Sequence, residues 1–260
     1  MQPLFRLNYV RAAVAVLAPL LIFLSVAFKK DKGFLDTQKS NVRVKTAYAD
    51  KQSLITERLK RLNLDMGNIN ILITVYKNER QLCIYAKRPD ERAYKMLSSY
   101  DICALSGSLG PKRKDGDRQV PEGFYYIDRF NPTSAYHLSL GLNFPNAADK
   151  IKCGSAKPGG DIFIHGKCLT IGCMPMTDDY IKEIYILAIQ ARQNGQLKIP
   201  VYIFPFKFDG VSAQGSMNTY ATNKPMLSFW NNLKTGYTKF NTNHQELKYA
   251  VNTAGDYVFQ

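Results

Sequence analysis

A histidine and two cysteines lie within nine residues of one another in the segment DIFIHGKCLTIGCMPMTDDY, residues 161–180. They are His165, Cys168 and Cys173, in a chain with only three histidines and five cysteines. A cysteine becomes a useful nucleophile when a nearby histidine or a helix N-terminus generates or stabilises its thiolate. The spacing therefore makes His165 and Cys173 candidates for a general base and a nucleophile.

The residues around this pair suggest how the chain brings the two side chains together. His165 ends a compact apolar segment, DIFIHG, that is typical of a strand. A tight loop over residues 166–172 can return the imidazole to the sulfur. Gly172 permits a sharp bend and lets a substrate carbonyl approach the backbone N–H groups there, which favours an oxyanion hole.

Other interpretations of the same residues stay open. Cys168 and Cys173 can form a disulfide that closes a short loop. Together with His165 they can also bind zinc, although a fourth ligand and a CxxC spacing are missing. His165 can be an inert core histidine. Elsewhere, Cys103 and Cys153 are either structural thiols or a disulfide, and the odd cysteine count leaves at least one thiol unpaired within the chain.

The elements that must position this pair are mostly strands. Alternating apolar residues predict two strands around a turn at residues 77–80, and further strands surround the cysteine segment. Period-3.6 spacing predicts one central helix that begins after an N-cap at Thr177 and ends at Asn194-Gly195. Cys173 then lies near the positive end of this helix. The remaining strands are expected within residues 93–107, 123–131, 135–144, 161–166 and 199–206, and a C-terminal helix within 226–240.

The N-terminus predicts export. Arg6 and Arg11 precede an uncharged apolar run over residues 12–28, which is typical of a signal peptide or signal anchor. Ser25-Val26-Ala27 resembles a cleavage site. We expect a polar tether with a short amphipathic helix at 53–64. The predicted organisation is 1–28 signal, 29–67 tether and helix, 68–210 catalytic domain and 211–260 extension packed on that domain.

The formal net charge is +14, from 35 Lys and Arg against 21 Asp and Glu. Such a balance favours anionic partners. Export excludes nucleic acid as the expected target, and the sequence has no zinc-finger, Walker A or dinucleotide-binding pattern. An anionic polymer or lipid outside the cytoplasm remains.

Several segments together resemble a known family. IHGKCLTIGC is similar to the active-site signature of the YkuD-type L,D-transpeptidase domain, and closest to its YafK-like branch. SGSLGPKRKDGDRQVPEGFYYIDRFNP, HLSLGLNFPN and GGDIFIHG agree with that branch in order. The resemblance covers residues 68–210. It implies a mostly β (α+β) fold, a β-sandwich or open barrel with one central helix and helical N- and C-terminal extensions.

The resemblance also implies roles for individual residues. Cys173 is then the nucleophile, His165 the general base, and Gly172 the glycine before the nucleophile. Ile171 departs from the pattern, since many members carry a second histidine there. By the same resemblance, or by their place before and beside the cleft, the expected substrate-binding residues are Thr170, Gly166, Lys112, Arg118, Gln119, Pro121 and His137.

The implied activity is transfer of an acyl group from peptidoglycan stem peptides containing diaminopimelate through a thioester, without metal or cofactor. The free carboxylates of such peptides suit a basic surface. The alternatives are an amidase or hydrolase that releases a wall-linked lipoprotein or peptide, and a catalytically silent wall-binding module. The expected location is the periplasm, with membrane contact through the N-terminal segment.

Overall fold

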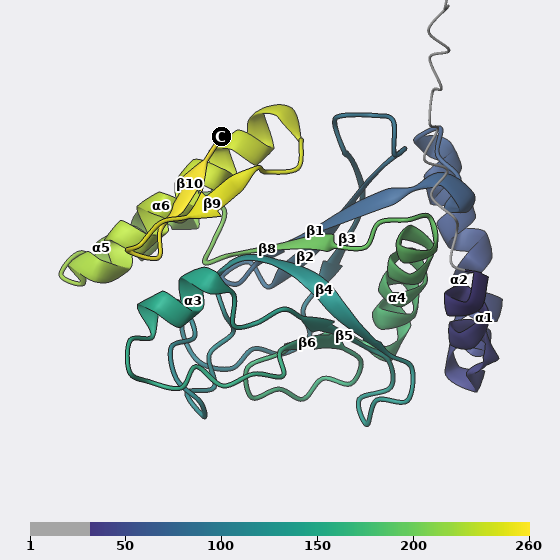
Figure 1. Cartoon of the computed structure of the whole chain (residues 1–260), viewed down its shortest axis with the longest axis horizontal. Coiled ribbons are helices and arrows are strands. Elements are labelled where there is room, and N and C mark those ends of the chain that lie inside the picture. Colours follow the sequence, from purple (N-terminus) through teal and green to yellow (C-terminus); the bar gives the residue numbers. More distant parts are fainter. Residues whose placement is uncertain (1–31) are drawn as a thin grey trace, which may run out of the picture.

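The computed structural model describes residues 32–260, so the predicted signal segment lies outside the described residues. The described part contains one large curled sheet with helices on both sides (Figure 1). No helix within residues 32–260 is both long enough and apolar enough to cross a bilayer.

The eight strands of the sheet have the order β3-β2-β1-β8-β4-β5-β6-β7. β1 runs parallel to β8, and β6 runs parallel to β7, while the other neighbours are antiparallel. The predicted turn at residues 77–80 joins the first two strands. The strands are β1 Asn70–Tyr76, β2 Gln81–Lys87, β3 Lys95–Asp101, β4 Gly123–Asn131, β5 Ser139–Leu142, β6 Phe163–His165, β7 Met174–Pro175 and β8 Ile199–Phe204.

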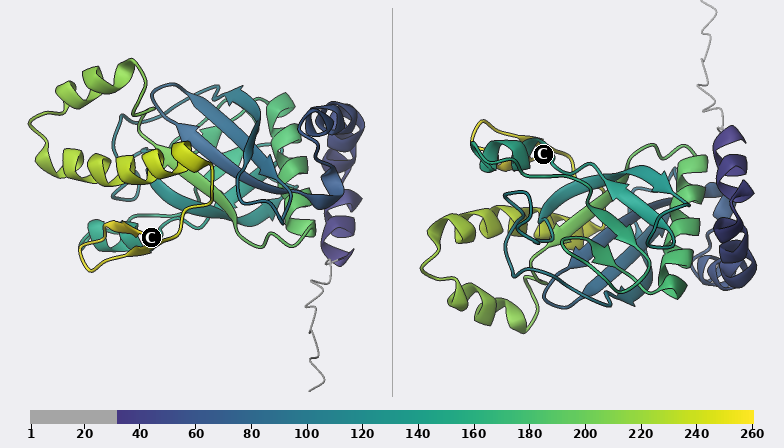
Figure 2. Two further views of the ribbon diagram at one scale, coloured as in Figure 1. Left: turned by 90° about the horizontal axis from the view of Figure 1, so that it is seen from above. Right: turned by 90° about the horizontal axis from the view of Figure 1, so that it is seen from below.

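Side chains alternate between the two faces of a strand, and in the central strands both faces are buried, each in a different core. In β1, Ile71, Ile73 and Val75 enter a core with α4 (Asp178–Gln193), whereas Leu72 and Tyr76 enter a second, aromatic core under α6 (Lys224–Asn243). Figure 2 shows the sheet between these two helices. The α+β class with a central helix and helical extensions is therefore confirmed.

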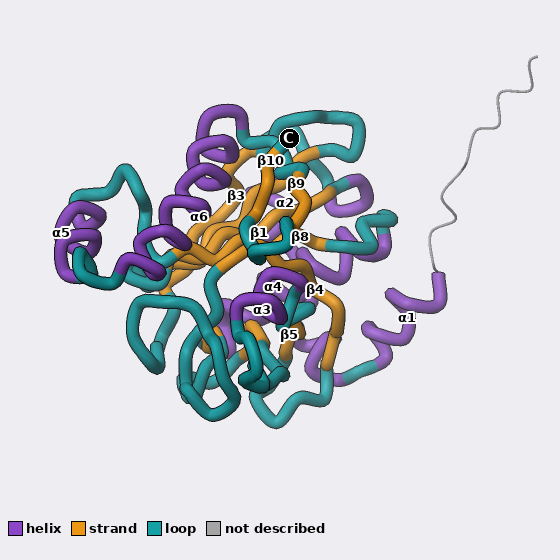
Figure 3. The backbone as a smooth tube through the Cα atoms, turned by 60° about the vertical axis from the view of Figure 1, so that its left-hand side comes forward, coloured by secondary structure: helices purple, strands orange, loops and turns teal. Residues whose placement is uncertain are grey.

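The elements on the aromatic side are largely C-terminal. They surround α6 and reach the end of the chain, as the tube in Figure 3 shows. Trp230 and Phe240 of α6 are fully buried, so this extension shares its core with the sheet. The further elements are α3 Ala147–Lys152, α5 Ser212–Thr219, β9 Tyr249–Val251 and β10 Tyr257–Phe259.

The N-terminal segment differs from its prediction. The expected tether forms α1 (Lys32–Ser40) and most of α2 (Val42–Arg61), which continues without a break through most of the expected short helix. The Asn41 side chain accepts a hydrogen bond from the Arg43 N–H and caps α2. Five buried apolar residues at helical spacing pack α2 against α4: Val44, Ala47, Tyr48, Ile55 and Leu59.

The many polar residues of α2 made its first half read as a polar tether, but several of them form ion pairs with α4. Lys51 lies 2.6 Å from Asp179, and Arg58 lies 2.7 Å from the buried Glu183. The η1 turn (Met66–Asn68) then leads into β1. The predicted third strand also ends early, at Asp101, because the chain leaves the sheet there to reach a disulfide at Cys103.

A buried ion pair fixes the long loop between β3 and β4. Lys77 Nζ lies 2.9 Å from Glu122 Oε1 and also donates to the carbonyls of Gly110 and Val120. Glu122 Oε2 accepts a hydrogen bond from Trp230 Nε1 at 2.8 Å. Buried charges need such complete partnering. The loop over residues 110–122 is therefore tied to both the sheet and α6.

Candidate active site

His165 and Cys173 lie on the same face of two paired strands. In the parallel pair β6–β7, Ile164 lies opposite Met174, and both side chains are fully buried in the core with α4. Neighbouring side chains along a strand point to opposite faces. His165 and Cys173, which directly precedes β7, therefore both point away from α4, although only four residues lie between Cys173 and the start of that helix.

Both side chains line one pocket of about 290 Å³. Three sequence-predicted residues meet there, namely His165, Thr170 and Cys173. The pocket wall also includes Ser134 and Tyr136, which the sequence analysis did not single out. The other lining residues are Asn131, Ser139, Asp161, Phe163, Leu169 and Ile171.

The His165 ring is held in one orientation. Its Nδ1 lies 2.6 Å from the carbonyl oxygen of Gly166, and its ring packs 4.8 Å from that of Tyr136 between centroids. A carbonyl can only accept, so Nδ1 carries the hydrogen and Nε2 keeps its lone pair. Burial lowers the pKa of His165, more strongly than the Gly166 hydrogen bond raises it. At neutral pH the ring is an uncharged base.

The Cys173 thiol is also uncharged at rest. Burial raises its pKa, against weaker lowering by a backbone hydrogen bond at Phe163 and by the charge of Lys112. Its Sγ lies 3.6 Å from the carbonyl oxygen of Asp161 and is not in a disulfide. At neutral pH the pocket therefore holds a neutral thiol and a neutral imidazole, the protonation states from which a histidine could take a thiol proton as the sulfur attacks.

The disulfide of this region differs from both sequence-based alternatives. Cys168 bonds to Cys103, with a Cα–Cα distance of 5.5 Å, and not to Cys173. Cys153 is a free thiol, so it does not pair with Cys103 either. No local pattern could identify the true pair, since its members are 65 positions apart in the sequence. Cys168 is in this disulfide, so it cannot bind zinc together with His165 and Cys173, and within residues 32–260 no group of three or more His, Cys, Asp and Glu side chains is placed to hold a metal ion.

The loop amides expected to form an oxyanion hole have a partner at rest. The N–H groups of Gly172 and Cys173 donate to Thr170 Oγ1 at 3.2 and 2.8 Å. The Thr170 hydroxyl in turn donates to the Cys173 carbonyl at 2.9 Å. Two amides that converge on one oxygen have the geometry that an oxyanion requires.

Gly172 is required by the backbone. Its φ is +138°, a conformation that side chains rarely adopt, and an added Cβ would lie 3.2 Å from the carbonyl oxygen of Gln119. The loop that carries Arg118 and Gln119 is therefore packed directly against the residue before Cys173. Gly166 is similarly confined, because its Cβ would lie 2.6 Å from Asp178 Oδ1.

The other predicted substrate residues lie outside the pocket wall. Lys112 is buried, and its Nζ binds Asp117 at 2.7 Å. The Gln119 amide exchanges hydrogen bonds with Ser108. Pro121 is buried, whereas Arg118 is exposed beside the catalytic loop. Lys112 and Gln119 thus bind within the loop, whereas Arg118 presents an exposed cation.

His137 belongs to a segment that supports the pocket. Its carbonyl and that of Ser134 accept hydrogen bonds from Arg43 Nη1 of α2, at 2.6 and 2.5 Å. Lys167 Nζ donates to the Ala135 carbonyl at 2.8 Å. Segment 134–137 thus presents Ser134 and Tyr136 to the pocket. No local pattern marked Arg43, because its partners lie more than 90 residues away.

Comparison with known proteins gives a consistent result. Residues 70–203 match the family model described as YkuD, L,D-transpeptidase catalytic domain. The chain is 34% identical over 229 residues to "Putative L,D-transpeptidase YafK" of Escherichia coli (strain K12), covering 87% of this chain and 82% of that protein. The protein of the same name from Escherichia coli O157:H7 matches equally.

Solved structures with related architecture are more distant. The helical cell shape determining protein Pgp2 from Campylobacter jejuni matches with a TM-score of 0.42 and 18% identity, over 70% of this chain and 73% of that one. Bdellovibrio bacteriovorus Bd1075 matches with a TM-score of 0.37 and 19% identity, over 66% and 62%.

Proposed function

The chain belongs to the YkuD family of L,D-transpeptidase catalytic domains, and we propose that it transfers acyl groups from peptidoglycan stem peptides containing diaminopimelate through a thioester on Cys173. One observation carries this proposal. A free thiol and an oriented imidazole share one face of paired strands and line one pocket. The substrate lies outside the cytoplasmic membrane, so the proposed location is the periplasm.

The acylation step follows from the resting protonation states. His165 Nε2 accepts the thiol proton as Cys173 Sγ attacks the carbonyl carbon of the donor peptide bond. The tetrahedral intermediate collapses, the C–N bond breaks, and the imidazolium returns that proton to the leaving amine. The product is a thioester between the donor acyl group and Cys173, with His165 neutral again.

The second half of the reaction repeats these roles in reverse. An acceptor amine loses a proton to His165 and attacks the thioester, and the thiolate leaves and regains the proton. The new amide is a cross-link. The Nδ1 hydrogen bond to Gly166 keeps Nε2 available in both halves.

Developing negative charge on the carbonyl oxygen requires donors. The amides of Gly172 and Cys173 are the proposed donors, and the substrate oxygen takes the place that Thr170 Oγ1 occupies at rest.

A second candidate is hydrolysis by the same machinery, in which water takes the place of the acceptor amine. An exposed rim supports it, since Leu169 and Ile171 are 69% and 77% exposed at the mouth of the pocket. A YafK-like amidase that releases wall-linked protein or peptide would use the thioester in this way.

The deciding experiment is incubation of the chain with purified sacculi, followed by mass spectrometry of the muropeptides. Transpeptidation gives new cross-linked species, and hydrolysis gives shortened or released stems. Cys173→Ala is the matched control and should give neither. An unchanged muropeptide profile with the parent protein, together with no acyl adduct on Cys173, would exclude both reactions.

A further inference from the structure

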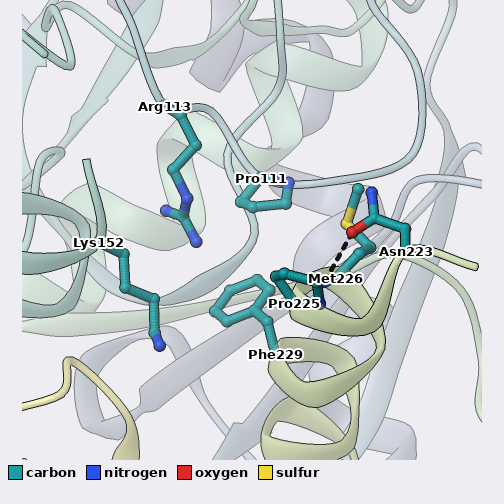
Figure 4. A pocket seen from close by; sticks show the side chains of 7 residues that line it. All are labelled: Pro111, Arg113, Lys152, Asn223, Pro225, Met226 and Phe229. Carbon is teal, nitrogen blue, oxygen red and sulfur yellow. Dashed lines mark hydrogen bonds between the residues drawn. The ribbon is translucent and has the colours of Figure 1, made fainter. Parts of the chain in front are cut away.

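A second cavity lies on the far side of the loop that contacts the catalytic cysteine segment. It has a volume of about 400 Å³ and is formed by Pro111 and Arg113 of that loop, Lys152 at the end of α3, and the first turns of α6. Figure 4 shows Arg113 and Lys152 reaching toward the same space beside Phe229. None of these residues lines the catalytic pocket.

The chemistry of this cavity is cationic over an apolar floor. The Arg113 guanidinium lies 5.0 Å from the centroid of the Phe229 ring. Pro225 and Met226 continue the apolar surface next to it. Two cations beside aromatic and aliphatic carbon suit a ligand with an anionic group and an adjoining less polar part.

Arg113 has capacity for another partner. Its Nη1 lies 3.4 Å from both Asp149 Oδ1 and the Lys112 carbonyl oxygen, which are long contacts. Within the described residues its Nε and Nη2 have no hydrogen-bond partner. A guanidinium with two free donors is suited to a planar carboxylate, which it can bind through both oxygens.

Lys152 is oriented toward the cavity by the C-terminal hairpin. Its Nζ lies 2.6 Å from Asp256 Oδ1 and 3.2 Å from the Ala254 carbonyl oxygen. Asp256 is partly exposed, so this pair is open to competition from a second carboxylate. The hairpin of β9 and β10 thus holds the Lys152 ammonium at the cavity, whose other lining groups come from the loop and from α6.

The cavity connects to the active site through the loop itself. Lys112 is adjacent to Arg113 in sequence, and its charge lowers the pKa of Cys173 against the larger effect of burial. Gln119, at the other end of the loop, contacts Gly172. The loop that forms one wall of the cavity therefore also contacts the segment that carries Cys173.

We propose that this cavity binds a carboxylate of an acidic peptide, as a subsite for a part of the wall polymer remote from the bond that reacts. This inference rests on the proposed function for the identity of the polymer. The anion-binding chemistry itself depends only on Arg113, Lys152 and the apolar floor. The subsite adds affinity and takes no part in the chemical step.

The test measures binding to full-length Cys173→Ala protein, in which no turnover occurs. The probe is the soluble tripeptide L-Ala-γ-D-Glu-meso-diaminopimelate, compared by titration calorimetry with the same peptide amidated at its carboxylates. Lys152→Gln and Arg113→Lys should each weaken binding of the free-acid peptide by about three- to tenfold. The amidated peptide should bind weakly to all variants.

Lys45→Gln is the matched control, because Lys45 is an exposed cation on α2, at the opposite end of the molecule (Figure 1). It should leave binding unchanged. Equal affinity of the parent and the Lys152→Gln protein, or no binding of the free-acid peptide to the parent, would overturn the inference. Thermal unfolding of each variant separates lost binding from lost folding.

The outcome is distinguishable from failure of the proposed function. If the parent protein with Cys173 intact forms no acyl adduct with sacculi but the peptide binds through Arg113 and Lys152, the subsite stands and the reaction fails. If the adduct forms at equal rates in the parent and in Lys152→Gln at limiting substrate, the reaction stands and the subsite fails.

Discussion

Cys103 and Cys168 form a disulfide that joins the chain just after β3 to the loop between the two strands of the candidate active site. The loop carries Thr170, Gly172 and Cys173, and Cys103 N–H also donates to the Pro175 carbonyl of β7 at 3.1 Å. Cys103 thus holds both the loop between β6 and β7 and the strand β7 itself, at the edge of the sheet.

Removing this disulfide should destabilise the protein and impair the site. The bond joins cysteines that are 65 positions apart in the sequence. Loop entropy alone then predicts that its removal lowers the free energy of unfolding by about 4 kcal/mol. The double variant Cys103→Ser/Cys168→Ser should show a lower Tm, measured by calorimetry. It should also acylate Cys173 more slowly, measured by mass spectrometry of the adduct. Cys153→Ser is the control and should behave as the parent, since Cys153 is a free thiol away from the pocket.

The pH dependence of acylation should be a broad plateau. The imidazole must be neutral to accept the thiol proton, and burial places its pKa below the usual 6.5, so activity rises on the acid side below pH 6.5. The thiol must still carry its proton for His165 to deliver to the leaving amine, and burial raises the pKa of Cys173 above 9.0, so activity falls only above pH 9.

Thiol alkylation provides an independent measurement of the same states. Labelling of Cys173 by iodoacetamide depends on the thiolate, so its rate should increase with pH through a midpoint above 9. Cys173→Ala should remove this phase. A midpoint near or below neutral pH would show a preformed thiolate–imidazolium pair and contradict the neutral resting state.

Thr170→Val should lower stability more than its size suggests. Valine has nearly the shape of threonine but gives the amides of Gly172 and Cys173 no oxygen. Losing these contacts costs about 1–3 kcal/mol of the free energy of unfolding. Thr170→Ser keeps the hydroxyl and should stay within about 1 kcal/mol of the parent. Denaturant unfolding checks both variants, and equal stability of the Val and Ser proteins would remove Thr170 from this role.

Gly172→Ala should distort the backbone next to the nucleophile. The φ of +138° is strained for any side chain, and the added Cβ would lie a tight 3.2 Å from the Gln119 carbonyl oxygen, at a cost of about 1–3 kcal/mol. Gly215→Ala is the control. Gly215 lies in α5, has an ordinary helical φ, and its added Cβ meets nothing within 4 Å, so helix propensity predicts a gain of about 0.5–1 kcal/mol. A Gly172→Ala protein with full stability and activity would contradict the assigned strain.

The sequence predicted best those features that local patterns encode. The compact apolar segment DIFIHG identified the strand that carries His165, and the Thr177 cap located the start of α4. The family resemblance predicted that His165 and Cys173 lie close together, and both line the same pocket. These properties depend on residues that are close in the chain.

Features that depend on distant residues were missed. The Cys103–Cys168 bond spans 65 residues, and the Lys51–Asp179 and Arg58–Glu183 pairs join α2 to a helix more than 120 residues away. The sequence predicted a polar tether that leads into a short amphipathic helix at 53–64, and gave no sign that Lys51 and Arg58 bind another helix. In the fold these charges border the apolar stripe that binds α4. The polar surface of α2 therefore gave no indication in the sequence that this helix packs against α4.

Arg43 connects this interface to the pocket, and replacing it should affect substrate binding more than chemistry. Its Nη1 holds the carbonyls of Ser134 and His137, and so positions Tyr136 against His165 without contacting either reacting group. Arg43→Ala removes both hydrogen bonds to a charged donor. We expect KM to rise about tenfold and kcat to fall less than about threefold.

Two variants on the same helix make this prediction specific. Arg43→Lys keeps a charged donor in reach of one carbonyl and should recover part of the KM. Lys45→Ala removes an exposed cation two residues away and should change neither constant. If Arg43→Ala instead lowers kcat at unchanged KM, segment 134–137 acts on His165 itself and not on the substrate wall. If Lys45→Ala has the same effect as Arg43→Ala, the general charge of α2 is responsible and the two hydrogen bonds are not.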